Sequence, residues 1–344
     1  MKNKDAINAL LSQYFDGRLV EIGKVFRHRK NRAIFKISVD GDDFVVTWRP
    51  KNKKVLREID ASTHFSALGI SPNVVCSDKH HGVLITQYIH NDNQNIGFHL
   101  TVQHLKQLGK TLSMIHQQTA LPLDTEMHRD IMRLKQIKET HAVIEKYPGR
   151  FSQIESALLE INHLSKYLLP LHYCHNDLWW ENVLITTETN KMAIIDWESS
   201  GMNDQFFDLA YICVFFQLTA TQEKRLLKSY YQGELPEAAL EKLLLIKILV
   251  VLKSCIKIFS EIVHHENLSI ANLPQLVRFS KWKPEAMPEI DLATDRGKYA
   301  VCMMLLSETE QLIKHQDKKA LLTKVKNFNK WVAAEFEKPP FVRL

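Results

Sequence analysis

The sequence predicts an α+β fold of two lobes, a small β-rich lobe followed by a larger, mostly helical one. The chain has 344 residues, enough for about two domains of ordinary size. Short runs rich in strand-forming residues dominate before about residue 90, and apolar residues at helical spacing dominate after it. We therefore expect an N-terminal lobe over residues 1–89 and a C-terminal lobe over residues 90–344, with ligands bound in a cleft between them.

The first 89 residues show strand and helix signals in turn. Three runs are expected as strands, namely Ala33–Val39, Phe44–Trp48 and Gly82–Ile89. Gly41-Asp42 is a turn signal, so the first two strands should form a hairpin. Between the second and third strands, residues 55–68 have a helical pattern that ends before Gly69 and Pro72.

The rest of the chain is dominated by helical periodicity. Apolar side chains at Leu105, Leu108, Leu112 and Ile115 are spaced three and four residues apart. This spacing places them on one face of a helix over about residues 101–118. Similar patterns predict helices over about 124–146, 151–168 and 321–336.

Composition excludes several classes of protein. Apolar residues make up 45% of the chain and charged residues 24%, which excludes a disordered or collagen-like chain. Five cysteines without a CxxC pair favour a reducing compartment and disfavour a zinc site. The longest apolar run, residues 243–252, contains Lys247 and is too short to span a bilayer. The N-terminus is a poor signal peptide, so we expect a soluble, cytoplasmic protein.

The segment around residues 173–196 is the most informative in the chain. His175 and Asp177 are followed by Asn182, five residues after the aspartate. Two apolar runs then surround a polar turn at 187–191, which predicts a hairpin, and Asp196 follows the second run. Antiparallel pairing should place Asn182 beside Asp196, with Asp177 one loop away.

These residue types suit phosphoryl transfer. A carboxylate and an amide oxygen are hard ligands of the kind that Mg²⁺ prefers, and ATP phosphates and waters would complete its coordination. A second carboxylate can orient the acceptor hydroxyl and take its proton. The alternative interpretation is that His175, Asp177 and Asn182 only cap and tie a loop. The predicted hairpin, with Asp196 directly after its second strand, favours the catalytic interpretation.

The same segment resembles the choline/ethanolamine kinase branch of the aminoglycoside-phosphotransferase-like, protein-kinase-like family. The matching residues are Cys174–Leu178 with Asn182, Ile195–Glu198, Gly201, Asn203-Asp204 and Phe207–Ala210. The resemblance implies that Asp177 is the catalytic base and that Asn182 and Asp196 bind Mg²⁺. It also implies that His175 and Asp208 are structural, and that Glu198 contacts a second metal or a cationic substrate.

Upstream, the resemblance implies a nucleotide-binding half. Arg49 would contact phosphates and Glu58 would pair with it. The segment Ile85–Ile89 would be the hinge that binds adenine through its backbone. Gln87 and Ile89 are the adenine-binding residues that this implies. The segment Phe26–Arg32 takes the place of the phosphate loop, with Asn31 at the position of the family's asparagine. It departs from the family because no glycine lies between residues 24 and 40, and the alternative is a solvated basic turn.

The sequence leaves the phosphate acceptor open. A quaternary ammonium binds in an aromatic cage, and Trp179 and Trp180 are the first candidates because they follow Asp177. Lys253 and Lys257 would repel a cation if they faced the pocket. We expect an ATP- and Mg²⁺-dependent kinase that acts on a hydroxyl of a small, cationic, choline- or ethanolamine-like molecule. The alternatives are an aminoglycoside or thiamine phosphotransferase, and a nucleotide-binding pseudokinase. No nucleic-acid partner is expected, because the basic residues before Arg57 accompany no nucleic-acid-binding motif.

Overall fold

The computed structural model describes most of the chain. The described residues are 11–18, 20–29, 32–90, 100–118, 135–169, 171–186, 189, 191–269, 273, 276–282, 287–314 and 316–336. They fall into two compact units. Unit 1 comprises residues 1–107, 118–122 and 175–200, and unit 2 comprises residues 108–117, 123–174 and 201–344. The lobe boundary expected between residues 89 and 90 remains a prediction.

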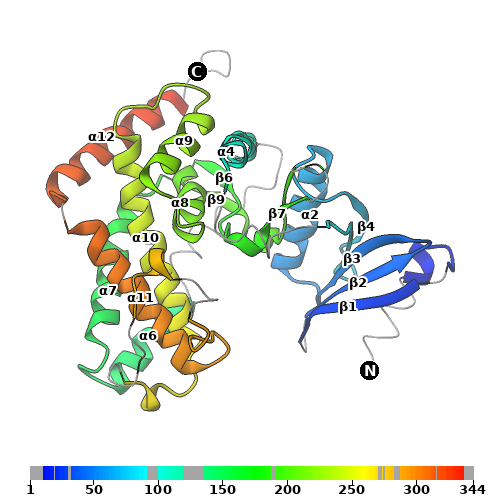
Figure 1. The fold of residues 1–344 in the computed structure, drawn as a ribbon, viewed down its shortest axis with the longest axis horizontal. Coiled ribbons are helices and arrows are strands. Elements are labelled where there is room, and N and C mark those ends of the chain that lie inside the picture. The colour runs from blue at the N-terminus through cyan, green and yellow to red at the C-terminus, as the bar shows by residue number, and fades with distance from the viewer. Residues whose placement is uncertain are drawn as a thin grey trace. The chain divides into compact units, whose positions relative to one another are not determined.

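Unit 1 is built on a five-stranded antiparallel sheet with strand order β1-β2-β3-β5-β4 (Figure 1). The strands are β1 (Val20–Arg29), β2 (Arg32–Val39), β3 (Asp42–Trp48), β4 (Val74–Asp78) and β5 (Val83–Gln87). Alternate residues of β2 are buried, as expected for a strand with one face on a core. The core of the sheet is apolar and includes Ile37, Val46 and Ile85, which are fully buried.

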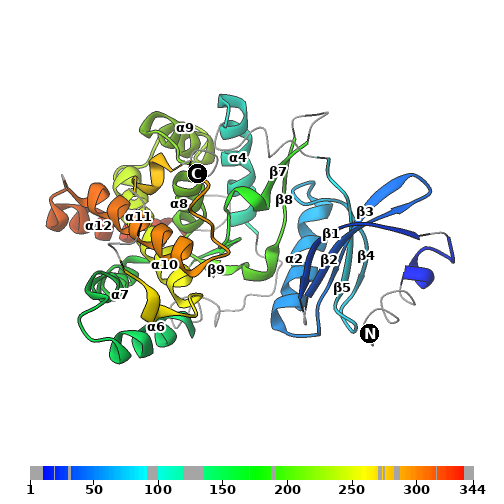
Figure 2. The ribbon, with the colours of Figure 1, turned by 60° about the horizontal axis from the view of Figure 1, so that its bottom comes forward.

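Helix α2 (Lys53–Ala67) packs on this sheet, where its Val55 and Ile59 cluster with Leu84 of β5 (Figure 2). Asn52 caps the helix by accepting hydrogen bonds from the backbone N–H groups of Lys54 and Val55. The predicted helix and the hairpin between β2 and β3 are both confirmed.

The segment Phe26–Arg32 was predicted to take the place of the phosphate loop, and its role in binding phosphate stays a prediction. Strand β1 continues to Arg29 and pairs there with Arg32, which extends the hairpin. Asn31, the proposed counterpart of the family's asparagine, lies outside the described residues.

Unit 1 also contains the segment that follows residue 174. It runs through the short 3₁₀ helix η2 (Trp180–Asn182), the hairpin of β7 (Val183–Ile185) with β8 (Met192–Ile194), and the 3₁₀ helix η3 (Trp197–Ser199). The predicted hairpin is therefore confirmed.

Unit 2 is mostly helical. Besides the last turns of α4 (Val102–His116), its helices are α6 (Lys135–Lys146), α7 (Ser152–Leu164), α8 (Gln205–Phe215), α9 (Ala220–Tyr230), α10 (Ala239–Ser260), α11 (Asp295–Ile313) and α12 (Lys318–Phe336). Three short 3₁₀ helices accompany them, η1 (Ser165–Tyr167), η4 (His265–Asn267) and η6 (Phe279–Lys281). Strands β6 (His172–Cys174) and β9 (Gly201–Asn203) pair antiparallel, so they hold the two ends of the segment 175–200 together.

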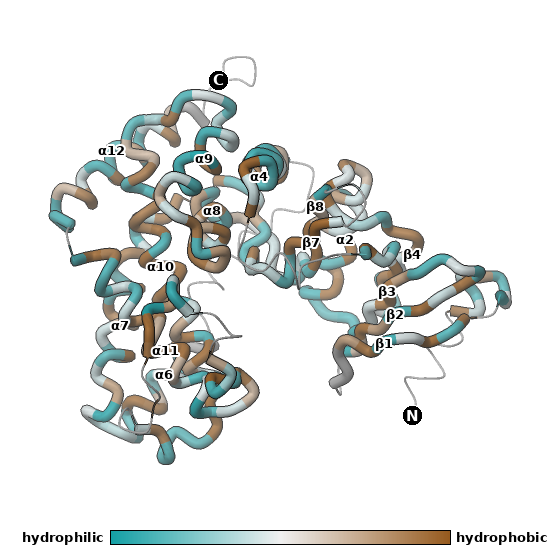
Figure 3. Tube along the Cα trace, viewed as in Figure 1, coloured by the Kyte–Doolittle hydropathy of each residue, from teal (hydrophilic) through white to brown (hydrophobic). Residues whose placement is uncertain are grey.

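Helix α10 forms the core of unit 2. Its 22 residues are apolar nearly all round and mostly buried, which is the pattern of an interior helix (Figure 3). The apolar run at residues 243–252 is thus the middle of a packed helix. None of the described helices has the length and apolarity that a bilayer-spanning segment requires. All five cysteines are described, and each is a free thiol.

Candidate active site

The loop that precedes β7 is held by its own backbone and by His175. Asn176 adopts a left-handed conformation with φ of 68°, which asparagine tolerates better than most residues. The backbone N–H of Asp177 donates to Nδ1 of His175 at 3.3 Å, and Nε2 of His175 donates to the carbonyl oxygen of Ile195 at 2.9 Å. The fully buried His175 therefore ties the Asp177 loop to the segment that carries Asp196, while Asp177 is half-buried.

Asn182 faces the Asp177 loop. Its side-chain Nδ2 donates to the carbonyl oxygen of Asp177 at 2.7 Å, which orients the amide oxygen away from that bond. The backbone N–H of Ile195 donates to the carbonyl oxygen of Asn182 at 3.0 Å, so Asn182 lies opposite Ile195. The expected pairing of Asn182 with Asp196 was wrong by one residue, because Val183 is in register with Ile194.

Asp196 follows the β7–β8 hairpin and has a left-handed backbone conformation, with φ of 63° and ψ of 59°. The next residue, Trp197, is fully buried and anchors this turn. Its ring stacks on Phe65 of α2 at 4.1 Å, and its Nε1 donates to the hydroxyl of Ser71 at 2.8 Å. The turn that presents Asp196 is thus fixed by packing on α2, and the strained backbone is compensated by buried contacts.

Two arginines, one at the start of β2 and one directly after β3, reach the carboxylates of this turn. Arg32 Nη2 lies 3.2 Å from Asp196 Oδ2, and Arg49 Nη2 lies 3.5 Å from Asp196 Oδ1. Arg32 also approaches Glu198 at 3.7 Å, Arg49 forms a close ion pair with Glu198, and Lys54 lies 4.0 Å from it. Burial alone would raise the pKa of Asp196, but the two guanidinium charges outweigh it and lower that pKa.

Glu58 of α2 is buried beside this group of charges. Burial raises the pKa of Glu58 to about 8; the negative charge of Asp196 adds to the shift, and the positive charges of Arg49 and Arg32 oppose it. Glu58 therefore ionises less readily than an ordinary glutamate, because it is buried and lies near the Asp196 carboxylate. The predicted pairing of Glu58 with Arg49 stays a prediction, because the ion pairs described for Arg49 are with Asp196 and Glu198.

The position of Arg49 depends on a glycine. The backbone N–H of Arg49 donates to the carbonyl oxygen of Gly82 at 3.0 Å. Gly82 has φ of +69°, and a Cβ atom at this position would overlap the carbonyl oxygen of Arg49. Only glycine combines this backbone conformation with such close approach.

Arg32 is the site residue that sequence reasoning missed as an individual candidate. It appeared only as one member of a basic run. The signal that identifies it is its place at the first residue of β2, at the end of the segment predicted to take the place of the phosphate loop. Its partner Asp196 is 164 residues away, a contact that no local pattern predicts.

The other predicted site residues of unit 1 have different surroundings. Gln87 is exposed at the end of β5, and its backbone N–H donates to the carbonyl oxygen of Asn73 at 2.8 Å. Ile89 is half-buried just beyond it. Trp179 and Trp180 are half-buried, with ring centroids 5.2 Å apart. Their proposed roles in binding adenine and the acceptor remain predictions.

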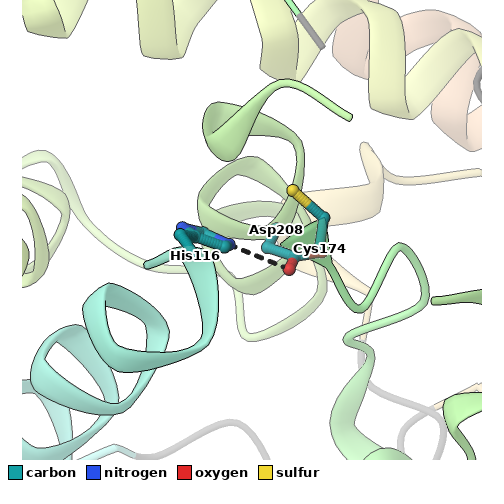
Figure 4. A group of neighbouring side chains, drawn as sticks. All are labelled: His116, Cys174 and Asp208. Atoms are coloured by element: carbon teal, nitrogen blue, oxygen red, sulfur yellow. Dashed lines mark hydrogen bonds and ion pairs between the residues drawn. The ribbon is translucent and has the colours of Figure 1, made fainter. Parts of the chain in front are cut away.

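Asp208, predicted to be structural, lies on α8 in unit 2. Its carboxylate is 3.1 Å from Nε2 of His116, at the end of α4 (Figure 4). Nδ1 of His116 is 2.9 Å from the hydroxyl of Tyr230. That hydroxyl donates its hydrogen to Gln205 at 2.8 Å, so it accepts a hydrogen bond from His116. The result is a buried polar network that joins α4, α8 and α9.

Cys174 lies beside this network, and the potential ligand atoms of His116, Cys174 and Asp208 are within 4.8 Å of one another (Figure 4). Burial raises the pKa of the Cys174 thiol well above its ordinary value, and the nearby Asp208 and Asp204 carboxylates add to the shift. Metal binding requires the thiolate. The thiol here is a hydrogen-bond donor to the carbonyl oxygen of Asp204, so we assign the group a structural role.

Removing the imidazole should destabilise unit 2. We expect His116→Leu to lower the free energy of unfolding by about 3 kcal/mol, because it takes a partner from a buried carboxylate and a buried hydroxyl. Urea denaturation measures this. His163→Leu, at an exposed histidine of α7, is the matched control and should change stability by less than about 0.5 kcal/mol. Equal stability of His116→Leu and the unaltered protein would show that the network contributes nothing.

Known proteins are similar to this chain in sequence and in fold. Protein LicA of Haemophilus influenzae is 26% identical over 178 residues, which are 51% of this chain and 66% of LicA. The matched segment thus spans just under two thirds of that relative.

Two solved structures share the fold. A choline/ethanolamine kinase family protein from Mesorhizobium loti superposes with a TM-score of 0.60 at 20% identity and covers 89% of this chain and 93% of that one. Spectinomycin phosphotransferase, solved with ADP and spectinomycin, superposes with a TM-score of 0.56 at 16% identity and covers 88% and 98%. These likenesses confirm the predicted α+β, protein-kinase-like fold. The model of the phosphotransferase enzyme family matches residues 24–243, more than half of the chain, and the chain therefore belongs to that family.

Proposed function

We propose that this protein transfers the γ-phosphate of ATP to a hydroxyl of a small molecule, with Asp177 as the base. One observation carries the proposal. Within unit 1, the Asp177 loop is bonded to Asn182 and to the segment of Asp196, and two arginines meet the same turn. A base, an oxygen-rich cation site and phosphate-binding cations are thus assembled around one short hairpin.

Asp177 has the features of a group that acts on an acceptor. It is half-buried, so its carboxylate is not sealed in a core. In the proposed reaction the carboxylate accepts the hydroxyl proton as the acceptor oxygen bonds to the γ-phosphorus, and the bond from that phosphorus to the bridging oxygen of ADP breaks. The products are ADP and the phosphorylated acceptor.

The donor set fits Mg²⁺ and a nucleotide. Asp196 offers a carboxylate that is 25% exposed, and Asn182 offers an amide oxygen, both of which are hard ligands. Bound there, Mg²⁺ would neutralise charge on the phosphates. Arg49 and Arg32 supply planar guanidinium groups, which pair well with phosphate oxygens. The solved structure with ADP supports an adenine nucleotide as the donor.

Choline or ethanolamine is the first acceptor class to test. One support is the Mesorhizobium loti protein of the choline/ethanolamine kinase family, which shares the fold. The other is the tryptophan pair that follows Asp177, since aromatic rings attract a quaternary ammonium. An aminoglycoside-like acceptor is the second candidate, supported by the spectinomycin phosphotransferase that shares the fold. Thiamine remains a third. A pseudokinase without turnover is the alternative that the glycine-free segment 24–40 favours.

An acceptor panel tests the proposal. The protein is incubated with Mg·ATP and with choline, ethanolamine, thiamine or spectinomycin, and ADP release is measured against a reaction without acceptor. We expect one acceptor to raise the rate at least tenfold. Nucleotide binding without acceptor-dependent ADP release from any of the four would favour the pseudokinase.

A further inference from the structure

Asp196, the proposed metal ligand, is already neutralised by the protein. Arg32, at the start of β2, and Arg49, which directly follows β3, approach its two carboxylate oxygens at 3.2 and 3.5 Å. The side chains of Arg32 and Arg49 are 15% and 7% exposed, so both guanidinium groups are largely withdrawn from water. A divalent cation that binds Asp196 in this arrangement would meet two positive charges within a few ångströms.

Arg32 also has unused binding capacity. Its Nε is buried and has no hydrogen-bond partner among the described residues, while its other nitrogens approach Asp196 and Glu198. A guanidinium presents five donors in a planar fork that matches two phosphate oxygens at once. Arg32 therefore has a donor that its present carboxylate partners do not satisfy.

The lack of glycine in the sequence around the start of β2 explains why a side chain is needed. Phosphate loops bring backbone N–H groups close to the phosphates, and glycine permits that approach. Residues 24–40 contain no glycine. Arg32 is the first residue of β2, and its guanidinium approaches the carboxylates of Asp196 and Glu198, so it can supply donors that such a loop would provide.

We propose that Arg32 alternates between two partners, the Asp196 carboxylate in the nucleotide-free protein and the polyphosphate of the bound nucleotide. This inference rests on the proposed function and adds a regulatory property to it. Phosphate draws Arg32 away from Asp196, which opens the carboxylate to the divalent cation. The polyphosphate and the cation then each strengthen the binding of the other, by a coupling of the usual size of about 5- to 150-fold.

Binding measurements test this without turnover. Mn²⁺ affinity is measured without nucleotide from the electron paramagnetic resonance signal of free Mn²⁺, and the affinities of ADP and inorganic tripolyphosphate are measured in EDTA by calorimetry. We expect Arg32→Gln to bind Mn²⁺ at least fivefold more tightly and both polyphosphates at least fivefold more weakly. Arg18→Gln, at an exposed arginine paired with Asp40, is the matched control and should change neither affinity.

The opposing results are distinct. Mn²⁺ affinity within twofold of that of the unaltered protein would overturn the proposal, and so would unchanged affinity for both polyphosphates. Arg32→Lys keeps the charge without the fork and should keep Mn²⁺ affinity low while still losing tripolyphosphate affinity; a gain in Mn²⁺ affinity there would oppose the proposal. Failure of every acceptor in the panel would defeat the proposed function only, because these binding readouts need no phosphoryl transfer.

Discussion

Asp177→Asn should lower kcat for acceptor phosphorylation by about 10²- to 10⁴-fold and leave the affinity for ADP unchanged. The loss is that of a general base, which contributes about this factor. The substitution keeps the shape of the side chain. The hydrogen bonds described for the residue, to Nδ1 of His175 and from Nδ2 of Asn182 and the backbone N–H of Trp179, use its backbone N–H and carbonyl oxygen, so the loop should be preserved.

Steady-state kinetics with the preferred acceptor give kcat, and calorimetry gives the ADP affinity. Asp42→Asn, at an exposed aspartate at the start of β3, should leave both unchanged. Turnover of Asp177→Asn within threefold of the unaltered protein would exclude Asp177 as the base. A joint loss of turnover and ADP affinity would instead show that the substitution disturbs the nucleotide site.

Lys253→Met should stabilise the protein at neutral pH by about 2–4 kcal/mol. Lys253 lies on α10, is 6% exposed, and its Nζ has no hydrogen-bond partner among the described residues. Its described contact is the face of the Phe207 ring, 4.5 Å away. Burial lowers the pKa of Lys253 from 10.5 to about 7, and the charge of Lys257 adds to the shift. Since one pKa unit corresponds to about 1.4 kcal/mol, holding this amine in the core costs several kcal/mol.

The same residue should make stability depend on pH. The amine binds a proton up to about pH 10.5 in the unfolded chain and only up to about pH 7 in the native one. Between these values the unfolded state binds more protons, so the free energy of unfolding rises with pH. The stability that this difference in proton binding adds with rising pH is fully present above pH 10.5. It is lost as the pH falls to about 7. Lys253→Met should remove this slope.

Urea denaturation at pH 7, 8.5 and 10 measures both effects. Lys319→Met, the same change at an exposed lysine of α12, should change stability by less than about 0.5 kcal/mol at every pH. Lower stability of Lys253→Met at pH 7, or an unchanged pH slope, would mean that the amine is better solvated in the native state than its burial indicates.

Strands and helices with strong local patterns were predictable from sequence. The hairpin of β2 and β3 was predicted because its turn carries Gly41-Asp42, and the helix over α2 because Gly69 and Pro72 end it. Strands β1 and β4 were not predicted. Residues 21–26 of β1 are exposed and therefore lack the alternation that marks a half-buried strand. Their strand conformation comes from pairing with β2, which is a tertiary effect.

The sequence alone determined the groups that carry the proposed chemistry, because Asp177, Asn182 and Asp196 belong to one short loop and hairpin that local residue patterns predict. Only the tertiary structure decided what surrounds them. Arg32 meets Asp196 across 164 residues, and the sheet and α2 bury Glu58 beside the same charges. Ion pairing and desolvation depend on neighbours in space, and the spacing of residues along a chain does not encode those neighbours.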